Sequence, residues 1–214
     1  GSLTSSTQFL AGCNSTTRGL FGGGANSSVT DVNTISYVTI ATTGNATSFG
    51  ALTIAVRFVA SCSSSTRGVF GGGTSSAAYT SVISYVTIAT TGNATSFGNL
   101  TVARGGFTPA ACSSSTRGLF GGGYDAVGVS NVIDYITIAT TGNATDFGDL
   151  TVARGNFAAC SSSTRGVFGG GEGSAGLSNV IDYVTIATVG NATTFGTLTT
   201  ATKELFGCSS NNGG

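Results

Sequence analysis

Five cysteines recur at one position of a repeated pattern, and their thiols are the side chains best suited to hold a metal or form disulfides. No second cysteine lies within a few residues of any of them, so their spacing matches no zinc-binding motif. A lone buried thiol packs as a small apolar side chain. We therefore expect reduced, mostly buried cysteines without a metal, and a metal site or a disulfide is the alternative. The five are Cys13, Cys62, Cys112, Cys160 and Cys208.

Histidine is absent from the chain, which removes the usual general base, the histidine of a catalytic triad and any histidine-ligated copper centre. Acidic side chains number eight. Of these, Asp134 and Asp182 share one position of the repeat, but Ser36 and Ser84 stand there in other copies. This exchange is expected of a polar strand position rather than of a catalytic carboxylate pair. The sequence therefore predicts no catalytic site and no cofactor, and we expect that the protein is not an enzyme.

A set of arginines recurs in the string T-R-G-[LV]-F-G-G-G, at Arg18, Arg67, Arg117 and Arg165. Four guanidinium groups near one axis would suit an anion. The simpler interpretation is that each arginine donates hydrogen bonds to backbone carbonyls at the turn of its own repeat unit. No helix or lysine follows the glycine triplets, so they are not phosphate loops, and we expect them to permit tight chain geometry.

The elements that position these residues form a tandem repeat. Successive arginines of the set are separated by 49, 50 and 48 residues. Each is followed by [SD]-Y-[VI]-T-I-A-T and then by G-N-A-T-x-F-G-x-L-T. A period of this length is typical of a propeller, a solenoid or a repeat array.

Each unit contains four predicted strands: A runs into the cysteine and ends in Ser-rich sequence, B is R-G-[LV]-F-G, C is I-x-Y-x-T-I-A, and D is F-G-x-L-T-V-A. The segments between them have turn chemistry. In strand C, Ile133, Tyr135 and Ala139 point to one face, and Ile136 and Ile138 to the other, so both faces are apolar. A sheet buried on both faces needs a neighbour on each side, as in a β-propeller. A linear β-solenoid is the alternative.

We therefore predict an all-β fold, a β-propeller of four four-stranded blades with a surplus terminal strand. The chain forms a single repeat domain, residues 1–214, with approximate units 3–53, 54–104, 105–154 and 155–202 and a closing strand 203–214. Both Phe9–Cys13 and Phe206–Cys208 match strand A. One of them is expected to close a ring of four blades, while the other caps an edge or pairs with a second molecule. The opening Gly1-Ser2 resembles the residue pair left by cleavage of an affinity tag.

Several of these features resemble the kelch repeat. Its blades place paired glycines at the end of a strand, here Gly71-Gly72, a tyrosine in the next strand, Tyr85, and an aromatic residue with leucine in the last, Phe97 and Leu100. An arginine before each new blade is matched by Arg57, Arg104 and Arg154, with Lys203 near that position in the last unit. Phe stands where kelch units usually have Trp. The resemblance implies a propeller and little about function, since kelch domains serve many purposes.

The amino-acid sequence of the repeat resembles that of structural proteins of marine T4-like bacteriophages, in runs such as N-V-I-D-Y-I-T-I-A-T-T-G-N-A-T-D-F-G-D-L-T-V-A-R. This resemblance implies a virion component, such as a tail fibre or another exposed module, that contacts other virion proteins and a host-surface glycan or protein. The chain would then be located in the virion or outside the cell. The rival hypotheses are a kelch-type protein-binding scaffold, natural or engineered and cytoplasmic, and a lectin-like or hydrolytic domain.

Composition excludes two classes of partner. Charged residues make up 7% of the chain and the formal net charge is zero, so nucleic acid and anionic membranes are poor partners. No apolar stretch has the length of a membrane span, and no signal peptide is recognised. The N-A-T sequences at Asn45, Asn93, Asn143 and Asn191 are formal glycosylation sites, but asparagine is also a favoured turn residue.

The repeats differ most at one predicted edge of the blades. Strands alternate in direction, so the B-to-C loops and D-to-A connections emerge together, and their sequences vary, whereas the A-to-B and C-to-D turns are nearly constant. Loops on a rigid scaffold commonly bind ligands. Neutral drift is the alternative explanation. If the edge binds a ligand, aromatic and polar side chains are the natural contacts, and the candidates are Tyr79, Tyr124, Asp125 and Glu172.

Overall fold

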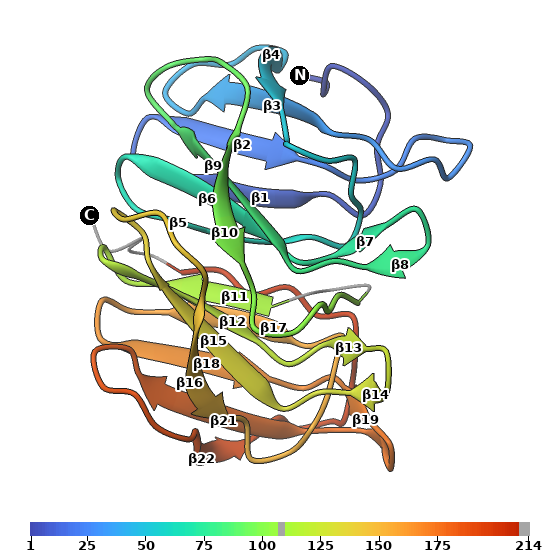
Figure 1. Cartoon of the computed structure of the whole chain (residues 1–214), viewed down its shortest axis with the longest axis vertical. Helices are drawn as coiled ribbons and strands as arrows, with labels where there is room; N and C mark the ends of the chain where they lie inside the picture. Colours follow the sequence, from blue (N-terminus) through green and yellow to red (C-terminus); the bar gives the residue numbers. More distant parts are fainter. Residues whose placement is uncertain (107–109, 210–214) are drawn as a thin grey trace.

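The computed structural model describes residues 1–106 and 110–209, and these residues contain β-strands and turns but no helix. Four antiparallel four-stranded sheets follow one another along the chain, each in the order A-B-C-D (Figure 1). The all-β class and the strand order within each unit are therefore confirmed.

The sheets have closely matching bounds. Sheet 1 contains β1 (Ala11–Asn14), β2 (Arg18–Gly22), β3 (Thr34–Thr39) and β4 (Thr47–Ala51). Sheet 2 contains β5 (Ala60–Ser63), β6 (Arg67–Gly71), β9 (Val82–Thr87) and β10 (Thr95–Asn99). Sheet 3 contains β11 (Ala110–Ser113), β12 (Arg117–Gly121), β15 (Val132–Thr137) and β16 (Thr145–Asp149). Sheet 4 contains β17 (Ala158–Ser161), β18 (Arg165–Gly169), β21 (Val180–Thr185) and β22 (Thr193–Thr197).

Three B-to-C loops contain a two-stranded hairpin that the sequence did not predict. The hairpins are β7 (Thr74–Ser75) with β8 (Ala78–Tyr79), β13 (Tyr124–Asp125) with β14 (Gly128–Val129), and β19 (Glu172–Gly173) with β20 (Gly176–Leu177). A glycine pair precedes each hairpin with positive φ, as at Gly72 (69°) and Gly73 (103°). Residues other than glycine rarely adopt a backbone conformation with positive φ. The predicted role of the glycine triplets in tight chain geometry is therefore confirmed.

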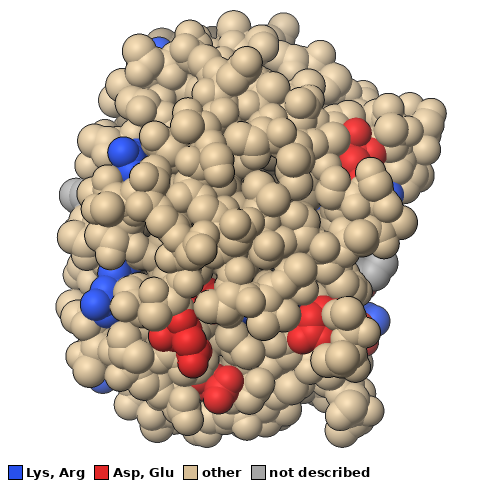
Figure 2. All heavy atoms as spheres, viewed as in Figure 1, with Lys and Arg blue, Asp and Glu red and all other residues tan. Residues whose placement is uncertain are grey.

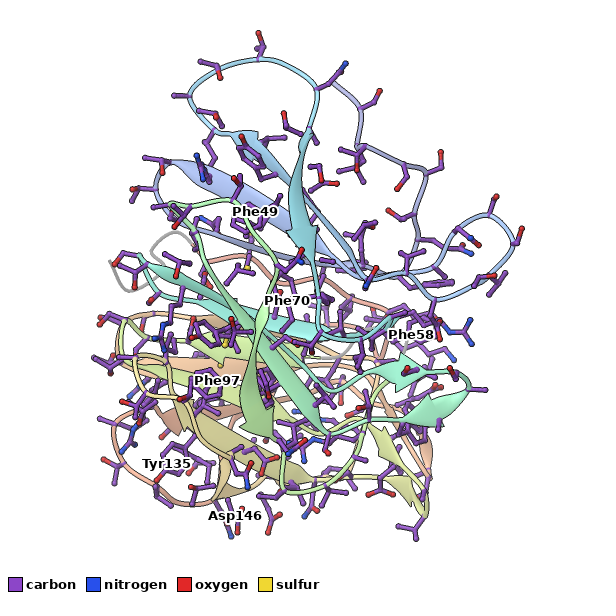
Figure 3. All side chains as sticks on the ribbon, turned by 45° about the horizontal axis from the view of Figure 1, so that its top comes forward. Phe49, Phe58, Phe70, Phe97, Tyr135 and Asp146 are labelled. Atoms are coloured by element: carbon purple, nitrogen blue, oxygen red, sulfur yellow. The ribbon has the colours of Figure 1, made fainter. Side chains whose placement is uncertain are left out.

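The sheets pack face to face in chain order. The A strands β1, β5, β11 and β17 lie beside one another, while the D strands β4 and β22 lie at opposite ends of the molecule (Figure 1). Phe49 and Phe70 lie in the first of three apolar layers between sheets, and Phe97 lies in the second (Figure 3). The strand C prediction is confirmed, because Ile133 packs toward sheet 4 and Ile136 toward sheet 2, with exposures of 0% and 2%.

Two glycine contacts recur in every junction between sheets. A phenylalanine of strand B packs over the last glycine of the preceding strand B, so a Cβ added at Gly22 would lie 2.8 Å from Phe70 Cε1, and one at Gly71 would lie 2.9 Å from Phe120 Cε1. A cysteine packs over the next sheet's first glycine, and a Cβ at Gly68 would lie 2.9 Å from Cys13 Sγ. These glycines let adjacent sheets approach closely.

The predicted closure of a four-bladed ring is not found. The three apolar layers join sheets 1 and 2, 2 and 3, and 3 and 4, and no layer among the described residues joins sheets 4 and 1. The repeated close contacts fix the rotation from one sheet to the next, and three such steps leave sheet 4 apart from sheet 1. The assembly is therefore propeller-like and open within the described residues.

The first residues of the chain continue the repeat. Gly1-Ser2-Leu3-Thr4 matches the G-x-L-T at the end of strand D, and Ser2 N–H donates to Asn45 Oδ1 at 3.0 Å, as Ala51 N–H does to Asn93 Oδ1 at 3.1 Å. Gly1 and Ser2 therefore lie where the strand D of a preceding sheet would end. At the other end, Leu205 and Gly207 lie beside sheet 4 where a fifth strand A would lie, and the remainder of the predicted closing strand, residues 210–214, lies outside the described residues.

Candidate functional site

The B-to-C loops and the D-to-A connections lie at one edge of the sheets, as the alternation of strand direction predicted. Single β-bridges join each connection to the next hairpin, pairing Arg57 with Thr74, Gly105 with Tyr124 and Gly155 with Glu172. We call this side of the molecule the hairpin edge. Residues 103–106 also lie at this edge, and residues 107–109, which belong to the same variable stretch of the sequence, lie outside the described residues.

A polar cluster occupies the hairpin edge between sheets 3 and 4. Tyr124 Oη donates to Glu172 Oε1 at 2.8 Å, and Asn156 Nδ2 donates to the same oxygen at 3.0 Å. Lys203 Nζ lies 2.8 Å from Glu172 Oε2. Two of the predicted residues, Tyr124 and Glu172, are thus brought together, while Asn156 and Lys203 were not predicted as site residues.

The cluster shifts the ionisation of its members. Hydrogen bonds from Lys203 and Tyr124 lower the pKa of Glu172 below its usual value. Burial raises the pKa of the Tyr124 phenol, and the hydrogen bond to Glu172 raises it further. At neutral pH the cluster therefore presents a carboxylate, a neutral phenol and an ammonium group, a set that can exchange hydrogen bonds with hydroxyl groups of a ligand.

The other two predicted residues differ in their surroundings. Tyr79, on β8, is 40% exposed, and its phenol lies near enough to Tyr124 to raise the pKa of the Tyr124 phenol slightly. Asp125 Oδ1 accepts hydrogen bonds from the backbone N–H groups of Val127 and Gly128. Asp125 therefore stabilises the turn of its own hairpin, and Tyr79 is the more accessible contact.

The arginine that the kelch resemblance placed at Arg57 does not occupy the position of the other two. The bridge at Arg57 corresponds to those at Gly105 and Gly155, so Val56 is the counterpart of Arg104 and Arg154. Arg57 Nε instead lies 3.4 Å from Asp31 Oδ1 near the protein surface. The arginine that the kelch resemblance places at Arg57 therefore lies one residue after the equivalent position, which Val56 occupies.

Arg104 and Arg154 form two buried ion pairs that sequence reasoning missed. Arg104 Nη2 lies 3.0 Å from Asp134 Oδ2, and Arg154 Nη2 lies 2.8 Å from Asp182 Oδ2. All four side chains are at most 3% exposed. Burial lowers the pKa of both guanidinium groups, and the partner carboxylate opposes this shift. Asp134 and Asp182 are therefore structural, and the charges are unavailable to a ligand.

A signal for these pairs is present within the chain. Where the connection carries arginine, the following strand C carries aspartate, and where Val56 replaces the arginine, Ser84 replaces the aspartate. Thr7 and Ser36 are the corresponding residues for sheet 1. Correlated exchange between copies of one repeat indicates contact.

The arginines that begin strand B connect neighbouring sheets. Arg18 Nη1 donates to the carbonyls of Ile88 and Ala89 in sheet 2, both at 2.9 Å, and its guanidinium carbon lies 4.7 Å from the centre of the Tyr37 ring. The expectation of carbonyl partners is confirmed, but the carbonyls belong to the next sheet rather than to the arginine's own turn. In Arg18, Arg67 and Arg117 the Nη1 donors are therefore engaged in holding neighbouring sheets together.

The cysteines follow the prediction in part. Cys13, Cys62 and Cys112 are buried, Cys160 is half-buried, and Cys208 is exposed. Burial raises the pKa of the Cys13 thiol to about 12. In the part of the chain that the structure describes, all five thiols are free, and no cluster of three or more histidine, cysteine or acidic side chains could hold a metal ion.

Charged groups are sparse on the face shown in Figure 2. Acidic groups lie beside the hairpins at the right and on the lower front, whereas basic groups lie along the left edge and, in smaller number, beside the acidic groups at the right. Within residues 1–106 and 110–209, no helix has the length and apolar character needed to cross a membrane.

No protein-family model matches the chain, and no curated protein matches it. The function of the edge is therefore inferred from its geometry and chemistry.

Proposed function

We propose that the chain is a non-enzymatic recognition module whose hairpin edge binds a ligand on a host surface, most simply a glycan. The observation that carries the proposal is the contrast between the two edges of one repeat. The opposite edge has nearly the same sequence in every unit, whereas the hairpin edge differs in every unit and contains the Tyr124–Glu172–Asn156–Lys203 cluster. Phenol, carboxylate and ammonium groups suit the hydroxyl groups of a sugar.

The setting that we propose is a bacteriophage virion, in a tail fibre or another exposed component that contacts other virion proteins. This setting is supported by the resemblance of the repeat sequence to structural proteins of marine T4-like phages. The chain would then act in the virion or outside the cell. Its lack of histidine and the engagement of Asp134 and Asp182 in structural pairs support a non-enzymatic role.

A kelch-type protein-binding scaffold, natural or engineered and cytoplasmic, is the second candidate. Apolar side chains at the hairpin tips favour it, because Val127 is 96% exposed, Leu177 54% and Tyr79 40%. Exposed aromatic and aliphatic groups on loops are typical anchors at protein interfaces.

Glycan-array binding compared with capture of host surface proteins tests these candidates. We expect the wild-type chain to bind a defined glycan. A variant with Tyr79→Ala, Tyr124→Ala, Asp125→Asn and Glu172→Ala should lose binding and retain its fold, because surface ion pairs contribute about 0–1 kcal/mol and the asparagine keeps an acceptor for the hairpin turn. Thr141→Ala, on the opposite edge, is the matched control. Full binding by the fourfold variant would contradict the proposal, and selective capture of one protein without glycan binding would favour the second candidate.

A further inference from the structure

The two outermost sheet faces expose side chains that every internal sheet buries. On sheet 1, Ile40 is 53% exposed, and on sheet 4, Phe195 is 58% exposed. The counterparts of Ile40 are 1% exposed, and those of Phe195 are 1–3% exposed; they are Ile88, Ile138 and Ile186, and Phe49, Phe97 and Phe147. Each internal junction buries a counterpart of Phe195 on one sheet and a counterpart of Ile40 on the next sheet. The exposed faces of sheets 4 and 1 therefore carry the two complementary sides of such a junction.

We propose that a second copy of this chain covers both faces. Sheet 4 of each copy packs on sheet 1 of the other, head to tail, and two such junctions close two copies into one ring of eight sheets. In Figure 1 the A strands lie near the middle and the outer strands β4 and β22 lie at opposite ends, so the four sheets form a fan with its two end faces uncovered. A head-to-tail interface gives a ring when its rotation closes.

The close contacts of the internal junctions have matching halves at the two ends. At Gly169 an added Cβ would meet Ile181 Cγ1 at 3.8 Å and no phenylalanine, whereas at Gly121 it would meet Phe168 Cε1 at 3.0 Å. Phe21 of the second copy is the residue equivalent to Phe168, and it is half-buried rather than buried. Gly19 likewise lacks the cysteine that covers Gly68, and Cys160, on the far face of sheet 4, is half-buried.

The polar groups match as well. Arg18, Arg67 and Arg117 each donate to backbone carbonyls of the next sheet. Arg165 stacks on Tyr183, and its guanidinium has no carbonyl partner among the described residues. In the ring it reaches the carbonyls of Ile40 and Ala41 of the second copy, which correspond to Ile88 and Ala89.

The junction also avoids an unpaired buried charge. Internal connections with Arg104 and Arg154 require Asp134 and Asp182 in the following strand C. The connection after sheet 4 carries Thr202 at this position, and strand C of sheet 1 carries Ser36. A neutral residue therefore meets a neutral residue when sheet 1 of the second copy follows sheet 4.

The two ends of the chain carry equivalent segments for this junction. Residues 196–208, G-T-L-T-T-A-T-K-E-L-F-G-C, match residues 1–13, G-S-L-T-S-S-T-Q-F-L-A-G-C, at seven of thirteen positions without a gap. Thr4 shares a hydrogen bond with Ser36, just as Thr53 shares one with Ser84, so the first segment occupies the place of a preceding sheet's connection. Each junction has room for only one of the two segments, either residues 196–208 of one copy or residues 1–13 of the other. The segment that is displaced gives up its hydrogen bonds to sheet 1 or sheet 4, and the equivalent segment of the other copy makes the same hydrogen bonds in its place.

Size-exclusion chromatography with light scattering tests the proposal. We expect wild-type protein at twice the chain mass of 20.9 kDa. Ile40→Asp and Phe195→Asp place a charge in the junction, and Gly169→Ala blocks the space that Phe21 enters, so each should shift the protein to the monomer while its circular dichroism keeps the β-sheet signal of the wild type. Val127→Asp, at a hairpin tip that is 96% exposed, is the control and should remain dimeric.

Mixing the Ile40→Asp and Phe195→Asp variants tests the head-to-tail arrangement. Sheet 4 of the first variant and sheet 1 of the second are both wild type, so their mixture should recover a one-to-one dimer. A wild-type chain that stays monomeric at every soluble concentration would overturn the proposal. An assembly larger than two copies, a dimer insensitive to all three substitutions, or a mixture that stays monomeric would also overturn it.

Discussion

Replacing the buried Arg104–Asp134 pair by the residues of sheet 2, valine and serine, tests whether the two residues act as a unit. Asp134→Ser leaves the Arg104 guanidinium 3% exposed, and among the described residues its remaining acceptor is the Phe120 carbonyl at 2.9 Å. Arg104→Val leaves the Asp134 carboxylate, 0% exposed, with hydrogen bonds from Thr101. Removing one partner of a buried ion pair costs about 3–5 kcal/mol, so each single substitution should lower the free energy of unfolding by this amount.

The double substitution Arg104→Val with Asp134→Ser should be far milder than either single one. No buried charge remains, and the main loss is the hydrogen bond to the Phe120 carbonyl, about 1 kcal/mol. The free energy of unfolding is measured by urea titration, with circular dichroism and tyrosine fluorescence as two probes of cooperativity. We expect a coupling energy of about 3 kcal/mol or more. Asp31→Asn, at the more exposed Arg57 pair, is the control and should cost at most about 1 kcal/mol.

Arg104 and Asp134 would not act as a unit if each single substitution cost less than about 1 kcal/mol, or if the double substitution cost as much as the two single ones together. Either result would mean that Arg104 and Asp134 contribute independently. The correlation between the connection and strand C would then have no energetic basis.

Gly71→Ala should lower the free energy of unfolding by about 1–3 kcal/mol, because its Cβ would lie 2.9 Å from Phe120 Cε1, whereas Gly169→Ala should leave the stability of the monomer unchanged in the same urea titration. Cys208 should react fastest with a thiol reagent and Cys160 more slowly, while Cys13, Cys62 and Cys112 should react after unfolding; several fast-reacting thiols in native protein would contradict this. The pKa of Glu172 is lowered from its usual 4.5 in the folded state, so its contribution to stability is present above about pH 4.5 and is lost as the pH falls below that value. The melting temperatures of the wild type and of Glu172→Gln should therefore converge as the solution is acidified.

The sequence predicted the strands and their two buried faces because the repeat shows each strand four times. Ile136 and Ile138 alternate with Ile133 and Tyr135 in a pattern that packing between two sheets explains directly. The β7–β8 hairpin and its equivalents were missed because their strands are two residues long and lack an apolar alternation. Short local pairing of this kind depends on the glycine geometry before it.

Contacts between units were the hardest to predict. The partners of Arg18 are backbone carbonyls of Ile88 and Ala89, about seventy positions away, and a carbonyl leaves no mark in residue type. The same limit applies to ring closure, since the rotation between sheets depends on how deeply Phe70 packs over Gly22. Residue types identify the units, whereas close packing between units determines how they are arranged.

The proposed ring has a consequence for the proposed function. Head-to-tail stacking keeps every strand in the same sense, so the hairpin edges of both copies lie on one side of the ring, whereas face-to-face stacking would place them on opposite sides. Two edges on one side can engage a host surface together, and linked binding raises apparent affinity by about 10²- to 10⁴-fold when the geometry permits it. The Ile40→Asp monomer should therefore bind an immobilised, dense layer of the identified glycan much more weakly than the wild type does, while its affinity for the same glycan free in solution stays unchanged by calorimetry. Equal loss in both formats would show that Ile40 affects the binding edge itself and would contradict the link between ring and recognition.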